Sequence, residues 1–375
     1  MAEADFDVAV IGGGVVGLAA AASLAKRSGS VVLFERHDEF GRETSSRNSE
    51  VVHAGIYYEA GSLKARLCVE GRRMLYELCD EDGVPHNKCG KVIVAVSGAE
   101  EAELERLRSV GAANGVEGLR MLDAAGVREL EPRVAAVAGL LSPESGIVSA
   151  HDLMDALARR AEARGADLLR GAEVLGLSSS LGAWEIGYRD SEEEGAVTAR
   201  AVVNSAGLGA TNVMAMAGLD AGAMGLAVHL CKGEYFAVGG AKRREIGRLV
   251  YPVPRENLLS LGVHTVLGLD GGFKLGPSAF YVDEIDYGVD EANLPAFYED
   301  VKPYLPFLEP EDLTPDMSGI RPKLSGPGES ARDFHIAHEP EAPGFFNLVG
   351  IDSPGLTAAP AIGEHVAGLV AAYLG

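Results

Sequence analysis

A glycine-rich turn near the start of the chain constrains the fold more than any other feature. Residues 7–11 (DVAVI), which are apolar after Asp7, are typical of a strand buried on both faces of a parallel sheet. Gly12, Gly14 and Gly17 follow at GxGxxG spacing and open an Ala- and Leu-rich helix that Gly29 ends. Such glycines allow a tight bend, a close approach of a pyrophosphate and close helix–strand packing. The pattern predicts a Rossmann-like unit that binds a dinucleotide, with an ordinary α/β glycine turn as the alternative.

A carboxylate at the end of the next predicted strand narrows the choice of nucleotide. Residues 31–35 (VVLFE) form a second buried strand, and Glu35 follows Gly12 by 23 positions (35 − 12). That spacing is close to the roughly 20 residues at which a carboxylate binds a ribose 2′-hydroxyl. Because a carboxylate repels a 2′-phosphate, NADP is disfavoured, and NAD or FAD is expected.

Two later segments favour FAD over NAD. Residues 199–210 (ARAVVNSAGLGA) form a strand ending in Ser-Ala-Gly that returns the chain to the dinucleotide. Residues 345–366 (FFNLVGIDSPGLTAAPAIGEHV) form a strand, a Gly- and Pro-containing loop and a helix that begins near residues 355–357. A helix N-terminus carries partial positive charge, which would stabilise an anionic reduced flavin. A simple NAD dehydrogenase does not need that closing element.

The pattern of strands and helices predicts two domains in an α/β fold. Residues 225–285 carry glycine-broken strands typical of an antiparallel sheet, whereas both ends of the chain have the βαβ pattern. We expect a discontinuous Rossmann-like FAD-binding domain with a parallel sheet, and an inserted, mainly antiparallel β domain that binds substrate. The expected bounds are 1–80, 145–215 and 318–375 for the first domain, and 81–144 and 216–317 for the second.

Composition excludes several classes of partner. The formal net charge of −22 argues against nucleic acid and anionic membrane surfaces, because either needs basic patches, but it does not exclude a local cationic pocket. The four cysteines show no metal-binding spacing, so reduced thiols and no metal site are expected. No basic segment precedes the first apolar run, and no apolar run reaches about 18 residues. A cytoplasmic protein without a transmembrane segment is expected, and peripheral attachment to a membrane stays open.

The segment NSEVVHAGIYYEAGSLKARLCVEG (48–71) resembles, without gaps, the signature of the L-2-hydroxyglutarate dehydrogenase family in the D-amino-acid-oxidase-type flavoprotein superfamily. Further similarity runs through CGKVIVAVS (89–97), GIVSAHDL (146–153), GIRPKLSGPG (319–328) and VGIDSPGLTAAPAI (349–362), and so covers nearly the whole chain. There are departures. Glu50 stands where the family usually has glycine. Lys232 stands where it usually has arginine, and Leu230 and Cys231 before it replace the usual Pro–aromatic pair. Since arginine and lysine differ at a bidentate site, the second departure puts the substrate preference in doubt.

The resemblance implies an enzyme that oxidises a small 2-hydroxy acid by hydride transfer to N5 of FAD. The substrate that the resemblance favours is L-2-hydroxyglutarate, and the product is then 2-oxoglutarate. An amine-oxidising or glycerol-3-phosphate-oxidising flavoenzyme of the same superfamily is the alternative, and a non-catalytic flavin-binding redox module is a remote one. The electron acceptor (a quinone, an electron-transfer protein or oxygen), a covalent flavin link and the oligomeric state stay open.

The resemblance and the motifs together predict the residues that bind the cofactor. They come from the glycine turn, the end of the second strand, the segment after it, the two returning strands and the closing loop. They are Gly12, Gly14, Val16, Gly17, Glu35, Arg36, Thr44, Ser45, Asn48, Ser49, Val174, Ser205, Ala206, Gly207, Arg321, Gly350, Asp352, Ser353, Pro354, Gly355, Leu356 and Thr357.

The proposed chemistry also needs a base for the hydroxyl proton and a cation for the carboxylate. Arg321 is the predicted cation, since its guanidinium suits a carboxylate bidentately. His53 and His264 both stay candidates for the base, because histidine titrates near neutral pH. The predicted substrate-binding residues are Tyr57, Tyr251, Lys64 and Lys323, and for each a purely structural role is about as well supported.

Overall fold

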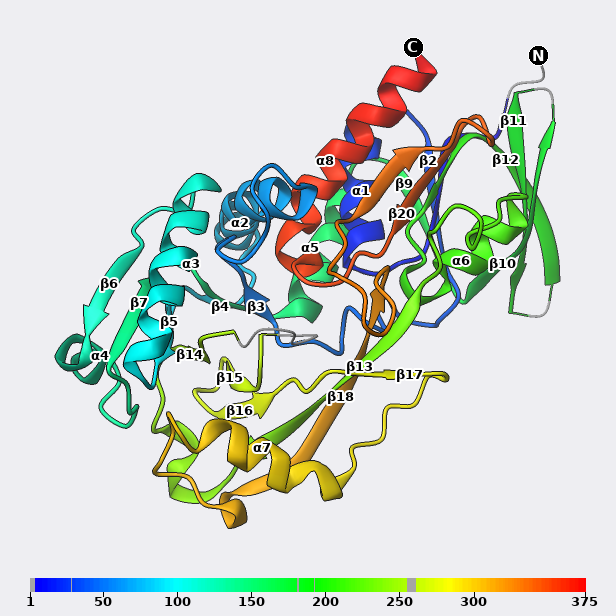
Figure 1. The fold of residues 1–375 in the computed structure, drawn as a ribbon. Helices are drawn as coiled ribbons and strands as arrows, with labels where there is room; N and C mark the ends of the chain where they lie inside the picture. Colours follow the sequence, from blue (N-terminus) through cyan, green and yellow to red (C-terminus); the bar gives the residue numbers. More distant parts are fainter. Residues whose placement is uncertain (1–3, 28, 181, 192, 255–260) are drawn as a thin grey trace. The chain divides into compact units, whose positions relative to one another are not determined.

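A computed structural model describes residues 4–27, 29–180, 182–191, 193–254 and 261–375 of the chain. The chain divides into two compact units (Figure 1). Unit 1 comprises Met1–Ser46, Ala150–Leu230 and Arg321–Gly375, and unit 2 comprises Arg47–Ser149 and Cys231–Ile320. Each unit is described separately below.

Unit 1 is built on an eight-stranded mixed sheet. Five neighbouring strands are parallel, in the order β9-β2-β1-β12-β20. The antiparallel strands β10 and β11 extend the sheet beside the first half of β12, and β19 pairs with β20. The strands are β1 (Phe6–Ile11), β2 (Val31–Glu35), β9 (Ala166–Arg170), β10 (Ala172–Ser180), β11 (Ala183–Asp190), β12 (Glu193–Asn204), β19 (His335–His338) and β20 (Phe345–Val349). This sheet confirms the expected fold class.

Helix packing in unit 1 centres on α1 (Val15–Arg27), which contacts both α5 (Ala150–Glu162) and α8 (Gly355–Leu374) (Figure 1). The α1 sequence is rich in alanine, the strongest helix former, and its last turn carries Lys26 and Arg27, which complement the helix dipole. The small α1 side chains let α8 approach closely. A Cβ on Gly363 of α8 would lie 2.4 Å from the Ala19 carbonyl oxygen of α1. A shorter helix, α6 (Ala210–Met216), follows β12.

Unit 2 contains three sheets and the helices α2 (Leu63–Asp82), α3 (Glu101–Ala113), α4 (Ala124–Leu130) and α7 (Leu294–Val301). One sheet has the order β14-β5-β7-β6, in which β14 (Leu249–Pro252) is parallel to β5 (Lys91–Ala95). The remaining strands of that sheet are β6 (Arg120–Asp123) and β7 (Ala138–Ser142). A three-stranded sheet has the order β3-β8-β4, formed by β3 (Val51–Val52), β8 (Gly146–Val148) and β4 (His86–Asn87).

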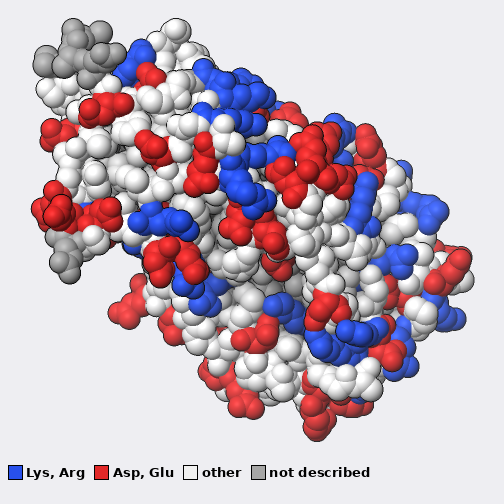
Figure 2. Space-filling model, turned by 180° about the vertical axis from the view of Figure 1, so that it is seen from behind, with Lys and Arg blue, Asp and Glu red and all other residues white. Residues whose placement is uncertain are grey.

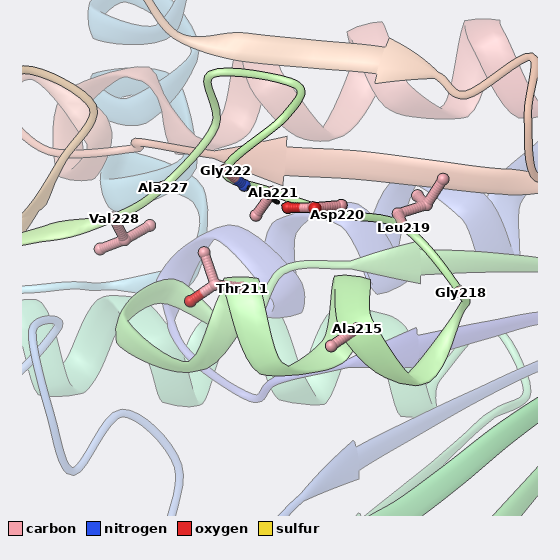
Figure 3. Close-up of a pocket in the computed structure, with 9 residues that line it drawn as sticks. All are labelled: Thr211, Ala215, Gly218, Leu219, Asp220, Ala221, Gly222, Ala227 and Val228. Carbon is pink, nitrogen blue, oxygen red and sulfur yellow. Dashed lines mark hydrogen bonds between the residues drawn. The ribbon is translucent and has the colours of Figure 1, made fainter.

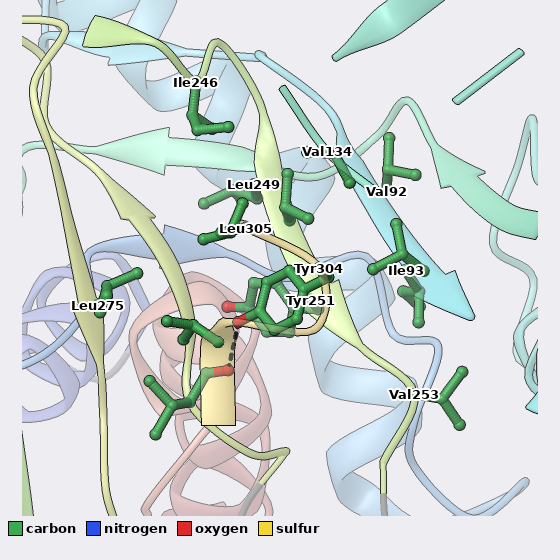
Figure 4. Packing of buried hydrophobic residues seen from close by; sticks show 14 of the residues in the cluster. Val92, Ile93, Val134, Ile246, Leu249, Tyr251, Val253, Leu275, Tyr304 and Leu305 are labelled. Carbon is green, nitrogen blue, oxygen red and sulfur yellow. Dashed lines mark hydrogen bonds between the residues drawn. The ribbon is translucent and has the colours of Figure 1, made fainter. Parts of the chain in front are cut away.

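The third sheet belongs mainly to unit 2 and has the order β15-β16-β13-β17, with β18 paired to β13. Its strands are β13 (His229–Val238), β15 (His264–Leu267), β16 (Phe273–Gly276), β17 (Phe280–Val282) and β18 (Leu313–Lys323). The buried core of unit 2 joins strands β5 and β14 to the segment around Tyr304 and Leu305 (Figure 4). In that core the Tyr304 hydroxyl donates to the Val263 carbonyl at 2.7 Å.

The units differ in extent from the expected domains. Residues 47–80 lie in unit 2, although the sequence assigned them to the FAD-binding domain. Two contacts explain this: β3 pairs with β8, and the Asn114 side chain at the end of α3 donates to the carbonyls of Gly55 (2.9 Å) and Tyr58 (2.8 Å). Conversely, residues 216–230 fall in unit 1 because Leu219 and Leu226 pack in its core.

Two surface properties bear on function. On the face shown in Figure 2, acidic and basic side chains are interspersed, although acidic residues outnumber basic ones in the chain by 55 to 33. Among the described residues, no helix is both long and apolar enough to cross a membrane.

Candidate functional site

The carboxyl ends of the parallel strands bring the predicted dinucleotide segments of unit 1 together. The glycine turn follows β1, residues 205–207 follow β12, and Gly350 follows β20. The chain leaves β1 toward β2 on one side, while β12 pairs with β1 on the other. Dinucleotides bind at such a switch point, in the crevice outside the carboxyl ends of the strands.

The glycine turn tolerates no side chain at its key positions. Gly12 has φ +105°, a conformation that other residues rarely adopt. A Cβ on Gly17 would lie 1.9 Å from the Gly12 carbonyl oxygen, and one on Gly14 would lie 2.9 Å from the Ser45 hydroxyl. The same hydroxyl accepts a hydrogen bond from the Val15 amide at the start of α1 (3.0 Å). This cradle fits a pyrophosphate that needs close backbone approach at a helix N-terminus.

Glu35 lies at the end of β2 with its carboxylate turned toward the glycine turn. It accepts hydrogen bonds from the amides of Gly13 (2.8 Å) and His37 (2.9 Å), and only 7% of the residue is exposed. Each carboxylate oxygen keeps acceptor capacity beyond these bonds, as a ribose hydroxyl requires. The neighbouring Arg36 is exposed and forms an ion pair with Glu43.

The closing segment of the chain is tightly organised before α8. The Asp352 carbonyl accepts from the Gly355 amide at 2.6 Å, and α8 begins at that glycine. The buried Asp352 carboxylate lies 3.3 Å from the Lys323 ammonium. Lys323, predicted to bind substrate, is therefore already paired with a carboxylate that was itself predicted to contact the cofactor. The start of α8 presents a helix N-terminus, the feature expected beside a reduced flavin.

The remaining predicted cofactor residues fall into both units. Thr44 and Ser45 belong to unit 1, whereas Asn48 and Ser49 belong to unit 2. The Asn48 side chain accepts from the Glu50 amide at 2.8 Å, and the Ser49 hydroxyl is 2.9 Å from that of Tyr235.

In unit 1, Val174 is buried in the core beside β2, and the Ser205 hydroxyl donates to the Ile11 carbonyl at 2.9 Å. Arg321 lies half-buried on β18, where unit 1 resumes. The other predicted residues of unit 1 lie in the first turn of α1, after β12, or just before and at the start of α8: Val16, Ala206, Gly207, Ser353, Pro354, Leu356 and Thr357.

Unit 2 gathers basic and phenolic side chains around Lys91. The Lys91 ammonium lies 3.8 Å from the ring centre of Tyr251 and 5.5 Å from that of Tyr57. The Tyr251 ring in turn stacks on His264, with centroids 3.6 Å apart and planes 13° apart. His53 belongs to the same group, because its charged form is disfavoured by Lys91 and by His264. We call these five residues the Lys91 cluster.

Burial sets the protonation states of the Lys91 cluster. It lowers the pKa of Lys91 to about 7, partly offset by Cys68 and Cys89. Burial, with repulsion from Lys91 and His264, holds the pKa of His53 well below its usual value. Burial also raises the pKa values of Tyr57 and Tyr251 well above 10. The cluster therefore holds neutral phenols, a neutral His53 and a lysine that changes charge near pH 7.

Lys91 was not among the site residues predicted from the sequence. The available signal was a lysine at the start of an otherwise apolar strand, KVIVA, which the structure buries throughout. Only the parallel pairing of β14 with β5 reveals that Tyr251 lies next to it. Lys64, by contrast, is half-buried on α2, and Lys232 is paired with Asp286 at 2.6 Å.

A pocket lies beside α6 in unit 1 (Figure 3). It is lined mainly by small and apolar side chains, and Asp220 is the one charged residue among them. The Asp220 carboxylate accepts from the amides of Gly222 (2.9 Å) and Ala223 (3.0 Å). This lining offers no cation to an anionic substrate, so the pocket does not fit the predicted chemistry. Its residues are Thr211, Ala215, Gly218, Leu219, Asp220, Ala221, Gly222, Ala227 and Val228.

Comparison with known proteins agrees with this architecture. The family model described as "FAD dependent oxidoreductase" (DAO) matches residues 7–369. A mitochondrial L-2-hydroxyglutarate dehydrogenase of Arabidopsis thaliana is 39% identical over 407 residues, which cover 98% of this chain and 84% of that protein.

Solved structures extend the comparison. The dithionite-reduced L-alpha-glycerophosphate oxidase of Mycoplasma pneumoniae with FAD bound aligns with TM-score 0.86 and 27% identity, over 97% of this chain and 94% of its own. The glycine oxidase of Geobacillus kaustophilus aligns with TM-score 0.80 and 26% identity, over 98% and 95%. FAD is thus the cofactor that the dinucleotide cradle of unit 1 binds. Because the family model matches residues 7–369, nearly the whole chain, this chain belongs to the DAO family of FAD dependent oxidoreductases.

Proposed function

We propose that this protein oxidises L-2-hydroxyglutarate, or a close 2-hydroxy dicarboxylic acid, to the corresponding 2-oxo acid. The observation that carries the proposal is the 39% identity to the plant L-2-hydroxyglutarate dehydrogenase over 98% of the chain. The matched length includes both the dinucleotide cradle of unit 1 and the Lys91 cluster of unit 2.

The proposed reaction removes a proton from the substrate hydroxyl and a hydride from the carbon that carries this hydroxyl. FAD, when bound, supplies the two-electron acceptor. His53 is one candidate for the base, because its lowered pKa keeps the imidazole unprotonated at neutral pH and ready to accept a proton. The lowered pKa also makes it a weaker base, so proton transfer to His53 gains from a negative charge bound nearby.

His264 is the second candidate for the base. Its Nδ1 atom lies 3.2 Å from the Thr265 carbonyl oxygen, which can only accept a hydrogen bond. In the neutral ring Nδ1 therefore carries the proton, and Nε2 is left as the acceptor. Stacking on Tyr251 at 3.6 Å fixes the plane of the ring. A fixed, singly protonated imidazole is the form that a general base needs.

Arg321 remains the proposed group that binds the carboxylate next to the reacting carbon. A guanidinium fork binds a carboxylate through two parallel hydrogen bonds, which orients the ligand as well as attracting it. That orientation holds the Cα–H bond in one direction, which lowers the entropic cost of hydride transfer.

The structural neighbours make amines and glycerol phosphate the alternative substrates to test. The aligned L-alpha-glycerophosphate oxidase and glycine oxidase share this fold at 26–27% identity. A shared fold hosts several chemistries, so the substrate must be argued from the site and from closer relatives. An amine substrate loses a proton from nitrogen and needs no alcohol base, so it predicts tolerance of changes at both His53 and His264.

The test is an anaerobic titration of the FAD-loaded protein that follows the visible absorption of the flavin. We expect L-2-hydroxyglutarate to bleach the flavin with formation of 2-oxoglutarate, while the D-isomer does not. Bleaching by glycerol 3-phosphate or glycine instead would refute the proposed substrate. Because oxygen and other acceptors are absent, the result does not depend on the natural electron acceptor.

The base is identified with His53→Asn and His264→Asn in the same titration. Loss of the base should slow flavin reduction by about 10²- to 10⁴-fold. The slower reaction should also lose its dependence on the corresponding pKa. If the substrate reduces the flavin of both single variants at the wild-type rate, neither histidine is the base. The assignment of the base then fails, while the proposed substrate stands.

A further inference from the structure

The Lys91 cluster is a buried group of basic and phenolic side chains with no carboxylate among its members. Resting on the proposed function, we propose that Lys91 and the hydroxyls of Tyr57 and Tyr251 form an anion site in unit 2. This site binds the distal carboxylate of the substrate and selects dicarboxylic over monocarboxylic 2-hydroxy acids.

The first argument is the pairing of Lys91. Only 1% of this residue is exposed, and lysine is almost never so buried unless it is paired. In the part of the chain that the structure describes, no carboxylate forms an ion pair with it. Two other lysines differ, since the buried Lys232 pairs with Asp286 at 2.6 Å and the half-buried Lys323 with Asp352 at 3.3 Å. An anion from outside the chain would supply the missing partner.

The second argument comes from two phenols. The hydroxyls of Tyr57 and Tyr251 are buried and have no hydrogen-bond partner among the described residues. The nearby core tyrosine Tyr304 shows the usual alternative, because its hydroxyl donates to the Val263 carbonyl at 2.7 Å. Both unpartnered phenols face the Lys91 ammonium with their rings. An ammonium and two hydroxyl donors match the lone pairs of one carboxylate.

Lysine chemistry favours the distal carboxylate of the substrate. A lysine ammonium is a compact point charge that attracts an anion without fixing its plane, unlike the guanidinium fork. It therefore suits the carboxylate that adds affinity but takes no part in the reaction. The carboxylate beside the reacting carbon needs orientation as well, which is the role assigned to Arg321.

Binding at this site should draw a proton from solution. The groups that act on Lys91 or pack around it are Cys68, Cys89, His53, Tyr57, Tyr251 and His264, and none carries a negative charge at neutral pH. The Lys91 pKa of about 7 therefore reflects burial without a counter-charge. A bound carboxylate supplies that counter-charge, so the neutral amine takes up one proton and the pKa rises.

The experiment measures this proton by calorimetry, titrating FAD-loaded protein with glutarate in buffers of different ionisation enthalpy. With a pKa of about 7, roughly 0.9 proton should enter per glutarate bound at pH 8. Pentanoate, which has the same number of carbons but one carboxylate, should draw none at this site. Equal uptake for the two acids, or none for glutarate, would overturn the proposal. This arm needs no variant, so it decides even if substitutions prevent folding.

The variants test whether Lys91 is the group responsible. Lys91→Met should abolish the proton uptake and weaken glutarate binding by about 30-fold or more. Lys91→Arg keeps the charge but cannot deprotonate, so it should abolish uptake with a smaller loss of affinity. The matched control is Lys302→Met, since Lys302 also lies over a tyrosine ring (5.6 Å from Tyr298) but is 54% exposed and paired with Glu299. Wild-type behaviour of Lys91→Met would refute the assignment.

Flavin reduction separates this proposal from the proposed function. Lys91→Met should slow reduction by L-2-hydroxyglutarate much more than reduction by L-2-hydroxypentanoate, so the preference for the dicarboxylate falls. Equal slowing with both acids would reject the anion site and keep the proposed function. If wild-type flavin is not bleached by L-2-hydroxyglutarate but glutarate still draws a proton at Lys91, the anion site stands and the proposed function fails.

Discussion

The close packing of α1 on α8 allows a sharp test of how unit 1 is held together. In the variant Gly363→Ala, the new Cβ would lie 2.4 Å from the Ala19 carbonyl oxygen, 2.7 Å from its carbonyl carbon and 3.0 Å from the Ser23 hydroxyl. Because real Cβ contacts are essentially never below 3.0 Å, the backbones must separate by at least 0.6 Å (3.0 − 2.4).

The expected energies follow from this overlap. Overpacking against backbone costs about 1–3 kcal/mol, and alanine recovers up to about 1 kcal/mol of helix propensity over glycine. We therefore expect Gly363→Ala to destabilise unit 1 by about 1–2 kcal/mol. Gly368, on the same helix, has no atom within 4 Å of a new Cβ. Gly368→Ala should thus stabilise the protein by up to about 1 kcal/mol.

The assay is urea unfolding followed by the fluorescence of Trp184, the single tryptophan of the chain. Trp184 is 3% exposed in unit 1, and its indole N–H donates to the Pro343 carbonyl at 3.0 Å. Its signal therefore reports the unfolding of unit 1. Since α1 begins at the dinucleotide cradle, Gly363→Ala should also weaken FAD binding. The packing argument is refuted if the two variants shift the unfolding midpoint in the same direction by similar amounts.

Three further outcomes are expected. Glu50 has φ +53°, a left-handed conformation that is costly for a residue with a Cβ. Glu50→Gly removes this cost and Glu50→Ala keeps it, so the free energy of unfolding should be higher for Glu50→Gly by up to about 1 kcal/mol. Equal unfolding free energies of the two variants would contradict this. Glu35→Gln replaces one of the two acceptors for the amides of Gly13 and His37, so flavin fluorescence titration should show FAD affinity lowered about 10- to 100-fold; unchanged affinity would rule out the proposed role. Between pH 7 and 10.5 the folded state holds fewer protons at Lys91 than the unfolded chain, so the stability of the substrate-free protein should rise with pH, by at most about 1.4 kcal/mol per unit. Chemical unfolding across that range should show this rise reduced in Lys91→Met, and identical slopes would count against a buried, unpaired lysine.

The dinucleotide cradle could be predicted from sequence because its parts are local. A strand, a turn and a helix that follow one another in the chain must meet in space, and the three glycines report the close approaches directly. A Cβ on Gly17 would lie 1.9 Å from the Gly12 carbonyl oxygen, so this position needs glycine, as the spacing implied. Glu35 was found for a related reason, since adjacent parallel strands end at the same edge of a sheet.

Domain boundaries could not be predicted as well, because they depend on contacts between distant segments. The segment 47–80 follows the dinucleotide unit in sequence, but β3 within it pairs with β8, nearly a hundred residues later. No local pattern records that pairing. The preference for glycine at position 50, in contrast, was visible as a departure from the family, and the positive φ of Glu50 gives its physical reason.

The sequence by itself determined the fold class, the cofactor and the local elements, because these follow from hydrophobic periodicity and from a contiguous motif. Only the tertiary structure decided which ionisable groups share a buried environment. Lys91 and Tyr251 are separated by 160 positions (251 − 91), yet the parallel pairing of β5 with β14 brings them to 3.8 Å. The charge state of a buried group depends on its neighbours in space, and in this chain those neighbours come from segments that the sequence keeps far apart.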